Sequence, residues 1–498
     1  MKQFLIIPTG GKGQRFIDAG YKVYKPFLNI GHKTRIIDNI IKNFDRKNLE
    51  VIIIINSKYN KFCNFSLSKK KIHIINIKSH KLGPLYSIFL ASNKIKKIVG
   101  KNNIFISYSD INWKWNYKRV KKHILGKKVV IFSHTGFHPH LEVDSKSDFC
   151  RKNKKNNIIK ISQKKTFSKD YKKDLLAVGC YYFKSYEFID NFFKKSFSIF
   201  KNKKKEFYMV LLIKFLIRNN INIKYKNIKN FVHLGSPNQY GDYISWRTTI
   251  LKKFNKSLKF DNTNIMLMAG EGKRVKDLNT PKPFLDIGNF QIFKYILKKF
   301  GFKKNIIITN NKYLRKIKKN NFKIHLVSRT NSMLSTVEKS MEILRKNNNF
   351  FLTSCDCYGE LNKSKFNKFL KKNRPELVIF GYNFSNLQKK LINSHTALKI
   401  KNNKLFEIIV KHNSRSNSIG HAGFFWIKNH RIFQFIENFK KLRKFNREII
   451  VDDYFKYLFD KKKCKILFYK LDNYVHIGSV LEYKELKYWE NYFKKNNE

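Results

Sequence analysis

Residues Phe4–Arg15 read FLIIPTGGKGQR, a short apolar run that ends in a glycine-rich turn closed by an arginine. A second stretch of the same form, IMLMAGEGKR, occupies Ile265–Arg274. Apolar runs of this length predict buried β-strands. Glycines behind a strand let the backbone come close to a ligand without a Cβ in the way. The chain therefore presents one kind of candidate ligand-binding turn twice.

Other motifs recur in the same order after each turn. VYKPFLNIG (Val23–Gly31) pairs with TPKPFLDIG (Thr280–Gly288), and FISYSD (Phe105–Asp110) pairs with FLTSCD (Phe351–Asp356). The further pairs are IIKISQKK with LFEIIVKH, AVGCYYFK with GHAGFFWIK, and FVHLGSPNQYGDYISW with YVHIGSVLEYKELKYW. The spacing between partners shrinks smoothly, from 259 residues at the turns to 243 at the last tryptophans. Chance matches would not keep this register, so we predict a tandem duplication.

Within each copy, strand-like apolar runs alternate with segments of helical periodicity. QFLIIP, VIIIIN and IFISYS are typical of strands, and RIIDNIIKNF has the apolar spacing of a helix. This alternation predicts the α/β class, with two Rossmann-like domains, each a mostly parallel sheet with helices on both faces. We expect a first domain over residues 1–250, a polar linker over 251–263 and a more divergent second domain over 264–498. Ligands of such sheets bind at the carboxyl ends of the strands, where both turns fall.

The composition excludes several classes of protein. The formal net charge is +71, but the lysines are scattered in short runs, and no RNA-recognition, helix-turn-helix or zinc-finger pattern accompanies them. We interpret the charge as compositional drift with a general preference for phosphorylated ligands, and we expect no specific nucleic-acid partner. Six cysteines are too few for a disulfide framework. The apolar runs are too short for a membrane span and no signal peptide is evident, so we expect a cytoplasmic protein.

The residues of the turn suit phosphate. Successive backbone N–H groups would form an anion cradle, and Arg15 adds a planar fork for phosphate oxygens. The pattern is not a dinucleotide fingerprint, because an arginine replaces the third glycine, and it is not a Walker loop, because no GK[ST] follows. Lys25 and Lys282 place a second cation near each turn. Asp110 and Asp356, at strand ends facing the cradle, are what a Mg²⁺ site needs. Taken alone, each lysine could be a solvated side chain and each aspartate a helix cap. Their recurrence in both copies favours a phosphate and metal site.

This ordered set of motifs resembles the sugar-nucleotide-forming nucleotidyltransferases, and copy one is similar to bacterial members that act in surface-polysaccharide synthesis. The matching stretches of copy one are IIPTGGKGQRF, AGYKVYKPFLNIG, YSDINWKW, TGFHPHL, AVGCYYFKS and HLGSPNQYGDYISW. In copy two the resemblance is weaker but touches each main motif. It implies Mg²⁺-dependent attack of a sugar-1-phosphate oxygen on the α-phosphate of a nucleoside triphosphate, with pyrophosphate leaving. The partners would be a nucleoside triphosphate and a phosphorylated sugar or alditol.

The resemblance also implies a role for each matching residue. The nucleotide would be bound by the glycines of the turns and of the loop SHKLGPLYS: Gly10, Gly11, Gly13, Gly83, Gly270 and Gly272. Catalysis would depend on the cations near the phosphates: Arg15, Lys25, Arg274 and Lys282. The sugar phosphate would be bound by Lys164, Gly179, Lys411 and Gly423. The metal ligands would be Asp110 and Asp356.

Some positions depart from the family pattern. Tyr24 stands where a proline usually precedes the lysine. His233 in copy one and His476 in copy two stand where many members carry a second metal-binding aspartate, which leaves a second metal undecided. His138 and His140 of TGFHPHL could form a metal pair, but we interpret them as shaping the acceptor pocket or the loop beside it.

Copy two lacks the TGFHPHL stretch, and Val480 replaces the proline of GSP. Its pocket would admit a different acceptor, or the copy has decayed into a scaffold. Three functions stay open at this point: a tandem nucleotidyltransferase, a binding or regulatory protein on a degenerate scaffold of this family, and a cytidylyltransferase for a non-sugar phosphate. The glycine turn and the aspartate are present in both copies, which favours an enzyme.

Overall fold

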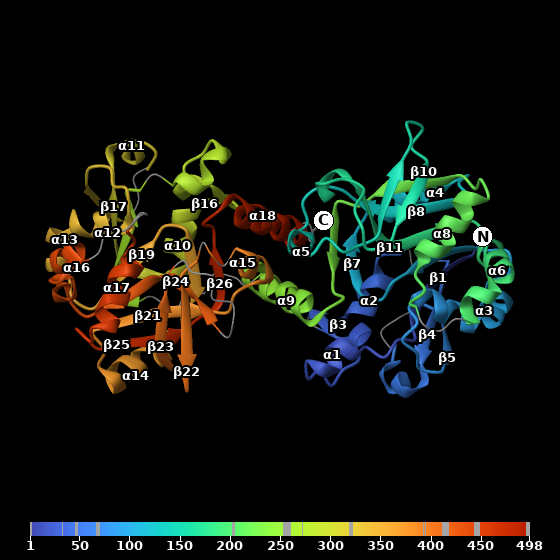
Figure 1. Ribbon diagram of the computed structural model, residues 1–498, viewed down its shortest axis with the longest axis horizontal. Coiled ribbons are helices and arrows are strands. Elements are labelled where there is room, and N and C mark those ends of the chain that lie inside the picture. Colours follow the sequence, from blue (N-terminus) through green and yellow to red (C-terminus); the bar gives the residue numbers. More distant parts are fainter. Residues whose placement is uncertain are drawn as a thin grey trace. The chain divides into compact units, whose positions relative to one another are not determined.

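The chain forms two compact units, Met1–Ile244 and Ser245–Glu498, each described by itself below (Figure 1). The computed structural model describes residues 2–31, 33–44, 48–65, 70–201, 205–251, 260–270, 272–317, 322–391, 393, 395–410, 418–442 and 449–494. The boundary falls inside helix α9 (Pro237–Leu251), earlier than the boundary expected at residue 250. Of the expected linker, 252–259 lie outside the described residues, and Phe260–Thr263 already belong to strand β14 (Phe260–Met268).

The first unit is built on a nine-stranded sheet of order β10-β9-β11-β6-β1-β4-β5, with β8 beside β11 and β12 beside β8. Its central strand β1 (Gln3–Thr9) runs parallel to β4 (Leu49–Asn56) and β6 (Asn103–Ser107), whereas β11 (Leu175–Phe183) is antiparallel to β6. The remaining strands are β5 (Ile72–Ile77), β8 (Val129–His134), β9 (Phe149–Lys152), β10 (Ile158–Ser162) and β12 (Ile223–Asn227). The predicted α/β arrangement is confirmed, and its sheet is mixed because β11 enters against the parallel strands.

Both faces of this sheet are covered. Successive residues of β1 point to opposite faces, and all four of Phe4–Ile7 are buried. Helix α3 (Pro84–Val99) packs on β1, β4 and β5; a proline opens it, and Leu85, Ile88 and Ile95 form its buried stripe. The other helices and 3₁₀ turns are α1 (Gln14–Asp18), η1 (Lys25–Phe27), α2 (Ile36–Lys42), η2 (Ser57–Phe62), α4 (Tyr117–Ile124), α5 (Pro139–Val143), η3 (Tyr171–Lys173), α6 (Glu187–Lys195), α7 (Phe197–Lys201) and α8 (Met209–Arg218).

The second unit shows the same strand pairings. Strand β14 is parallel to β17 (Phe302–Thr309) and β19 (Phe350–Ser354), and β24 (Ser418–Ile427) is antiparallel to β19. The sheet has the order β18-β17-β14-β19-β24-β21-β25, with β22 beside β24 and β23 beside β22. The remaining strands are β18 (Lys323–Leu326), β21 (Leu377–Tyr382), β22 (Ala397–Lys401), β23 (Lys404–Ile409) and β25 (Ile466–Lys470).

Short antiparallel pairs flank each sheet. They are β2 (Asn29–Gly31) with β3 (Thr34–Arg35), β7 (Ile111–Lys114) with β13 (Asn230–His233), β15 (Asp286–Ile287) with β16 (Phe290–Gln291), and β20 (Cys357–Glu360) with β26 (Asp472–His476). The helices and 3₁₀ turns of the second unit are η4 (Lys273–Leu278), η5 (Lys282–Phe284), α10 (Ile292–Phe300), α11 (Asn311–Leu314), α12 (Met333–Glu338), α13 (Met341–Arg345), α14 (Lys363–Asn373), α15 (Asn386–Lys390), η7 (His430–Phe433), α16 (Ile436–Leu442), α17 (Val451–Asp460) and α18 (Val480–Lys494).

The topology brings the predicted residues to one edge of each sheet. Because β1 and β6 are adjacent and parallel, the glycine turn after β1 and the aspartate after β6 emerge side by side. The same holds for β14 and β19 in the second unit. Within the described ranges, no helix has the length and apolar character that crossing a membrane requires.

Candidate active site

The two leading glycines of the first turn have different surroundings. A Cβ on Gly10 would lie 2.4 Å from Ile77 Cδ1, whereas a Cβ on Gly11 would meet nothing within 4 Å. Gly13 has a left-handed backbone, with φ of 67°, and opens α1. Gly10 therefore lies against neighbouring side chains, and Gly11 faces open space from which a ligand can approach. In the second unit, Gly270 is likewise open, and Gly272 has φ of 64°.

A tyrosine hydroxyl holds each turn in place. The Tyr24 hydroxyl is shared between the carbonyl oxygens of Thr9 and Gly11, lying 2.6 Å from that of Gly11, and Tyr313 of α11 donates to that of Gly270 at 3.0 Å. The ring of Tyr24 stacks on Tyr59, with centroids 3.9 Å apart. Burial raises the pKa of the Tyr24 hydroxyl far above its usual range, so this group stays a donor. A fixed carbonyl fixes the peptide plane and thus the direction of the next N–H group. The departure from the family's proline thus has a structural role.

The lysine of each KPF motif contacts the aspartate at the end of the neighbouring strand. Lys25 Nζ lies 3.0 Å from Asp110 Oδ2, and Lys282 Nζ lies 2.6 Å from Asp356 Oδ2. In both units the lysine belongs to a 3₁₀ turn that the following proline helps to form. The structure thus brings together, in each unit, a lysine and an aspartate separated by more than seventy residues of sequence.

Both aspartates stay ionised. Burial alone would raise the pKa of Asp110, but the positive charges of Lys25, above all, and of Arg15 outweigh it and lower that pKa. The same balance holds the pKa of Asp356 far below its usual range, because Lys282 lies against it. An ionised carboxylate at this edge is a suitable ligand for an oxygen-preferring divalent cation such as Mg²⁺.

The glycines predicted to line the sugar pocket lie on the antiparallel strand opposite the turn. Gly179 in β11 and Gly423 in β24 have backbone φ angles of 85° and 69°, which residues other than glycine rarely adopt. The carbonyl oxygen of Gly179 accepts a hydrogen bond from the backbone N–H of Tyr108, two residues before Asp110. A Cβ on Gly423 would lie 3.4 Å from Ser354 Oγ. Both glycines therefore lie close to the strand end that carries the aspartate.

Gly83 and Lys164 meet the same segment of the first unit. Gly83 is the N-cap of α3, and a Cβ there would lie 2.6 Å from the carbonyl oxygen of Phe207. The ammonium group of Lys164 lies 5.2 Å from the ring centre of the next residue, Tyr208. The backbone N–H of Lys164 donates to Asp148 Oδ1 at 3.2 Å. Gly83, predicted to face the nucleobase, and Lys164, predicted to bind the sugar phosphate, thus contact adjacent residues, Phe207 and Tyr208, just before α8.

Two predicted residues lack a described position. Lys411 falls outside the described residues, and so does the side chain of Arg274, although its backbone belongs to η4.

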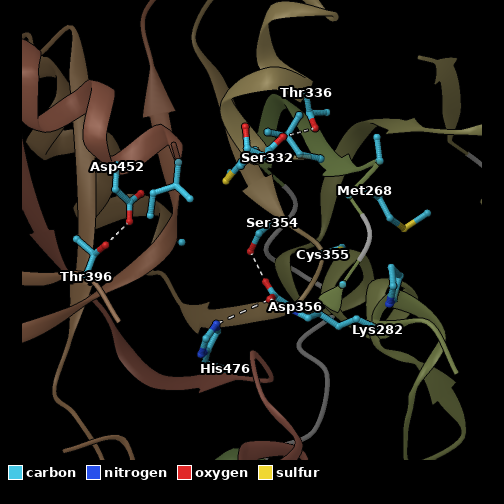
Figure 2. Close-up of a pocket in the computed structure, with 18 of the residues that line it drawn as sticks. Met268, Lys282, Ser332, Thr336, Ser354, Cys355, Asp356, Thr396, Asp452 and His476 are labelled. Carbon is cyan, nitrogen blue, oxygen red and sulfur yellow. Dashed lines mark hydrogen bonds and ion pairs between the residues drawn. The ribbon is translucent and has the colours of Figure 1, made fainter. Parts of the chain in front are cut away.

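The second unit contains a pocket of about 360 Å³ at the predicted place (Figure 2). The other five predicted residues of this copy all line it: Gly270, Gly272, Lys282, Asp356 and Gly423. Figure 2 shows Lys282 and Asp356 at the end of the pocket near Met268, with Ser354 donating to Asp356 Oδ1 at 2.6 Å. The scattered motifs of copy two therefore converge on one cavity.

A polar group on the other side of this pocket was not predicted from the sequence. The Asp452 carboxylate accepts a hydrogen bond from Thr396 Oγ1 (Figure 2). It also lies 3.2 Å from His421 Nδ1. All three side chains line the pocket. The available signal was weak, because copy one has Ala177 where copy two has His421. The group supplies hydrogen-bonding partners of the kind that orient a polar ligand.

In the first unit, the histidines of TGFHPHL join His233 in a buried cluster. The ring centroids of His138 and His233 lie 5.6 Å apart, and those of His138 and His140 lie 5.4 Å apart. Burial lowers the pKa of His233 to about 4, that of His140 to about 3, and that of His138 well below its usual range. The three rings are therefore neutral at pH 7 and add no charge beside Asp110.

Residues 5–196 match the family model described as nucleotidyl transferase. The matched region contains the first glycine turn, Lys25, Asp110, Lys164 and Gly179. Most of the first unit therefore matches the nucleotidyl transferase family.

Several solved structures have a similar fold over about half of this chain. They include the nucleoside-diphosphate-sugar pyrophosphorylase from Vibrio cholerae RC9 (18% identity, 48% of this chain and 99% of that chain, TM-score 0.40). The inositol-1-phosphate CTP transferase from T. maritima is similar at 15% identity, over 47% of this chain and 97% of that chain, with a TM-score of 0.37. A UTP-bound UGPase from Acinetobacter baumannii is similar at 13% identity, over 49% and 92%, with a TM-score of 0.38. No curated protein sequence matches this chain.

Proposed function

We propose that each unit catalyses Mg²⁺-dependent transfer of a nucleotidyl group from a nucleoside triphosphate to a phosphorylated sugar or alditol, releasing pyrophosphate. The observation that carries this proposal is the lysine–aspartate pair beside a glycine turn, which occurs in both units at contact distance. The family match over the first unit and the shared strand pairings of the second support it. We further propose that the two units arose by duplication and supply activated sugars for surface polysaccharide in the cytoplasm.

The turn and its arginine would position the triphosphate. The space that a Cβ on Gly11 would enter is open. The Tyr24 hydroxyl holds the carbonyl oxygen of Gly11 by a hydrogen bond. Backbone N–H groups of the turn would then donate to phosphate oxygens without reorganising. Arg15 lies near enough to Asp110 to lower its pKa, so its guanidinium would reach the same phosphates.

Lys25 and Lys282 would stabilise the charge that develops during transfer. An acceptor phosphate oxygen attacks the α-phosphorus, a new P–O bond forms, and the bond to the bridging oxygen of the leaving pyrophosphate breaks. No covalent protein intermediate is required, so positioning and charge neutralisation supply most of the rate. Mg²⁺ held by Asp110 or Asp356 would neutralise the α-phosphate when bound. Each lysine, already against its carboxylate, would donate to phosphate oxygens beside that ion.

The two units would differ in the acceptor. The second pocket offers Thr396, His421 and Asp452 on the side away from the glycine turn. The first unit has the neutral histidine cluster and the Lys164–Tyr208 contact. Hydrogen-bonding groups placed differently select different hydroxyl patterns, because an unmatched polar group is costly in a closed site. We therefore expect two different acceptor phosphates for one chain.

The test is a pyrophosphate-release assay with the full-length protein. Each of the four ribonucleoside triphosphates and dTTP is incubated with Mg²⁺ and a panel of sugar-1-phosphates, alditol phosphates and non-sugar alcohol phosphates. Release that requires one triphosphate, one sugar or alditol phosphate and Mg²⁺ supports the proposal. Release only with CTP and a non-sugar phosphate would instead indicate a cytidylyltransferase of that kind. No release with any pair, while nucleotide still binds by calorimetry, would indicate a binding scaffold.

A further inference from the structure

A second cluster of ligand-type side chains lies next to Asp356 in the second unit. The ring nitrogens of His395 and His476 and a carboxylate oxygen of Glu482 all lie within 4.8 Å of one another. Across the described ranges of the chain, this is the one group of three or more histidine, cysteine or acidic side chains found that close together. None of the three was predicted from the sequence as a metal ligand. Only His476 was named there, as standing where many family members carry a second metal-binding aspartate.

We propose that His395, His476 and Glu482 bind a transition metal ion of the zinc type, at a site distinct from the Mg²⁺ carboxylate. Two imidazoles and one carboxylate suit Zn²⁺, which takes nitrogen and oxygen ligands in a tetrahedral arrangement. Mg²⁺ prefers oxygen ligands throughout, so the two ions would be separated by ligand chemistry. The inference rests on these side chains alone and does not require the proposed transfer reaction.

The distances are close to those of a tetrahedral site. His476 Nδ1 lies 2.9 Å from Glu482 Oε1, and His395 Nε2 lies 3.2 Å from the same oxygen. With metal–ligand bonds of about 2.1 Å, neighbouring donors in a tetrahedron lie roughly 3.4 Å apart. The two measured distances are therefore within a few tenths of an ångström of that value, and the two imidazole nitrogens lie within 4.8 Å of each other.

The groups behind the cluster orient it in the way that metal sites use. Ser479 Oγ donates to the other carboxylate oxygen of Glu482 at 2.8 Å. The second ring nitrogen of His476, Nε2, lies 3.8 Å from Asp356 Oδ2. A ligating histidine commonly turns its other N–H toward a carboxylate, and Asp356 lies on that side of the His476 ring, beyond hydrogen-bond distance.

Burial and access also agree with a bound cation. Glu482 is only 2% exposed and His395 only 5%, and a buried carboxylate requires a compensating positive charge. His395 and His476 both line the 360 Å³ pocket, so an ion can enter. Three protein ligands leave a fourth position for water or a ligand atom.

The first unit supplies an internal control because it lacks the carboxylate. Gln239 occupies the position of Glu482, 243 residues earlier, and its Oε1 accepts from the backbone N–H groups of Gly235 and Ser236. Imidazole rings still pack together there, since the rings of His138 and His233 lie 5.6 Å apart, against 5.0 Å for His395 and His476. One tight zinc per chain is therefore expected, not two.

The experiment measures zinc content. Full-length protein is stripped with a chelator, exposed to Zn²⁺ in excess Mg²⁺, passed through a desalting column and analysed by inductively coupled plasma mass spectrometry. We expect one zinc per chain, lost in Glu482→Gln and in His395→Asn and retained in the matched first-unit variant Gln239→Ala. Circular dichroism checks that each variant is folded. Zinc content is read whether or not the chain releases pyrophosphate, so the two proposals fail separately.

Cobalt loading gives a readout that needs no variant. Co²⁺ bound by two imidazoles and a carboxylate in a four-coordinate site should produce visible d–d bands in the stripped protein, and added Zn²⁺ should abolish them. Absence of these bands, or of retained zinc, would overturn the proposal and leave a purely hydrogen-bonded cluster. Retention of zinc in folded Glu482→Gln and His395→Asn proteins would overturn it as well.

Discussion

Gly10 and Gly11 are adjacent and chemically identical, yet the structure gives them different tasks. A Cβ at Gly10 would collide with Ile77, whereas one at Gly11 would enter the open space assigned to phosphate. We expect Gly11→Ala to raise KM for the nucleotide in the first unit's reaction about tenfold, with an unchanged unfolding temperature. Gly10→Ala should instead lower the unfolding temperature, because overpacking costs on the order of 1–3 kcal/mol. Kinetics and thermal denaturation of both variants check this, and the reverse pattern would contradict the placement of the cradle.

The tyrosine hydroxyls give a matched pair of tests at the same scale. Tyr24→Phe keeps the stack on Tyr59 but removes the donor to Gly11, and Tyr313→Phe removes the donor to Gly270. A carbonyl left without its partner costs about 1–3 kcal/mol, part of which should appear as slower turnover in the affected unit. Steady-state rates with the substrates of each unit measure the effect. Equal loss in both units from either variant would show that the hydroxyls do not act locally.

At the scale of elements, the residue directly before β9, Asp148, is an acidic residue whose ionised form is destabilised by burial. Burial raises the pKa of Asp148 from 3.8 to about 6. Because the folded-state pKa is the higher one, protonation favours the fold, and this contribution is lost as the pH rises from about 4 to 6. Asp148→Asn keeps an acceptor for the N–H of Lys164 and removes the charge. We expect it to raise the unfolding temperature by a few degrees at pH 8 and by much less at pH 4.5. Calorimetry at both pH values decides, and a pH-independent gain would contradict the burial of an ionised carboxylate.

At the scale of the whole molecule, each unit has its own lysine–aspartate pair, so the activities should be separable. Asp110→Ala should abolish the reaction of the first unit and spare that of the second, and Asp356→Ala should do the opposite. The expected loss is on the order of 100-fold or more, since the residue acts on transition-state charge. Rates for each substrate pair are compared in the two single variants and the double variant. Full activity of Asp110→Ala toward every substrate would contradict the assignment of the first site.

Most of the fold and the core of each site were predictable from order and spacing. The apolar run before Gly10 had to be a strand, and the recurrence of the aspartate motif placed Asp110 and Asp356 on strands next to it. The hydroxyl donors were harder to predict, because Tyr24 and Tyr313 do the same task from different elements. Two copies can make the same hydrogen bond from residues that do not align in sequence, so comparing the two repeats does not reveal such donors.

Residue order alone therefore determines the α/β class, the repeated turn and the strand ends at which lysine and aspartate meet, because adjacent parallel strands bring their carboxyl ends to one edge. The polar group on the other side of the second unit's pocket depends on tertiary packing. Thr396, His421 and Asp452 come from separate segments, and Glu482 in the first turn of α18 contacts His476 at the end of β26. Such contacts form only when distant segments pack together, since hydrogen bonds and ion pairs act over a few ångströms whatever the separation along the chain.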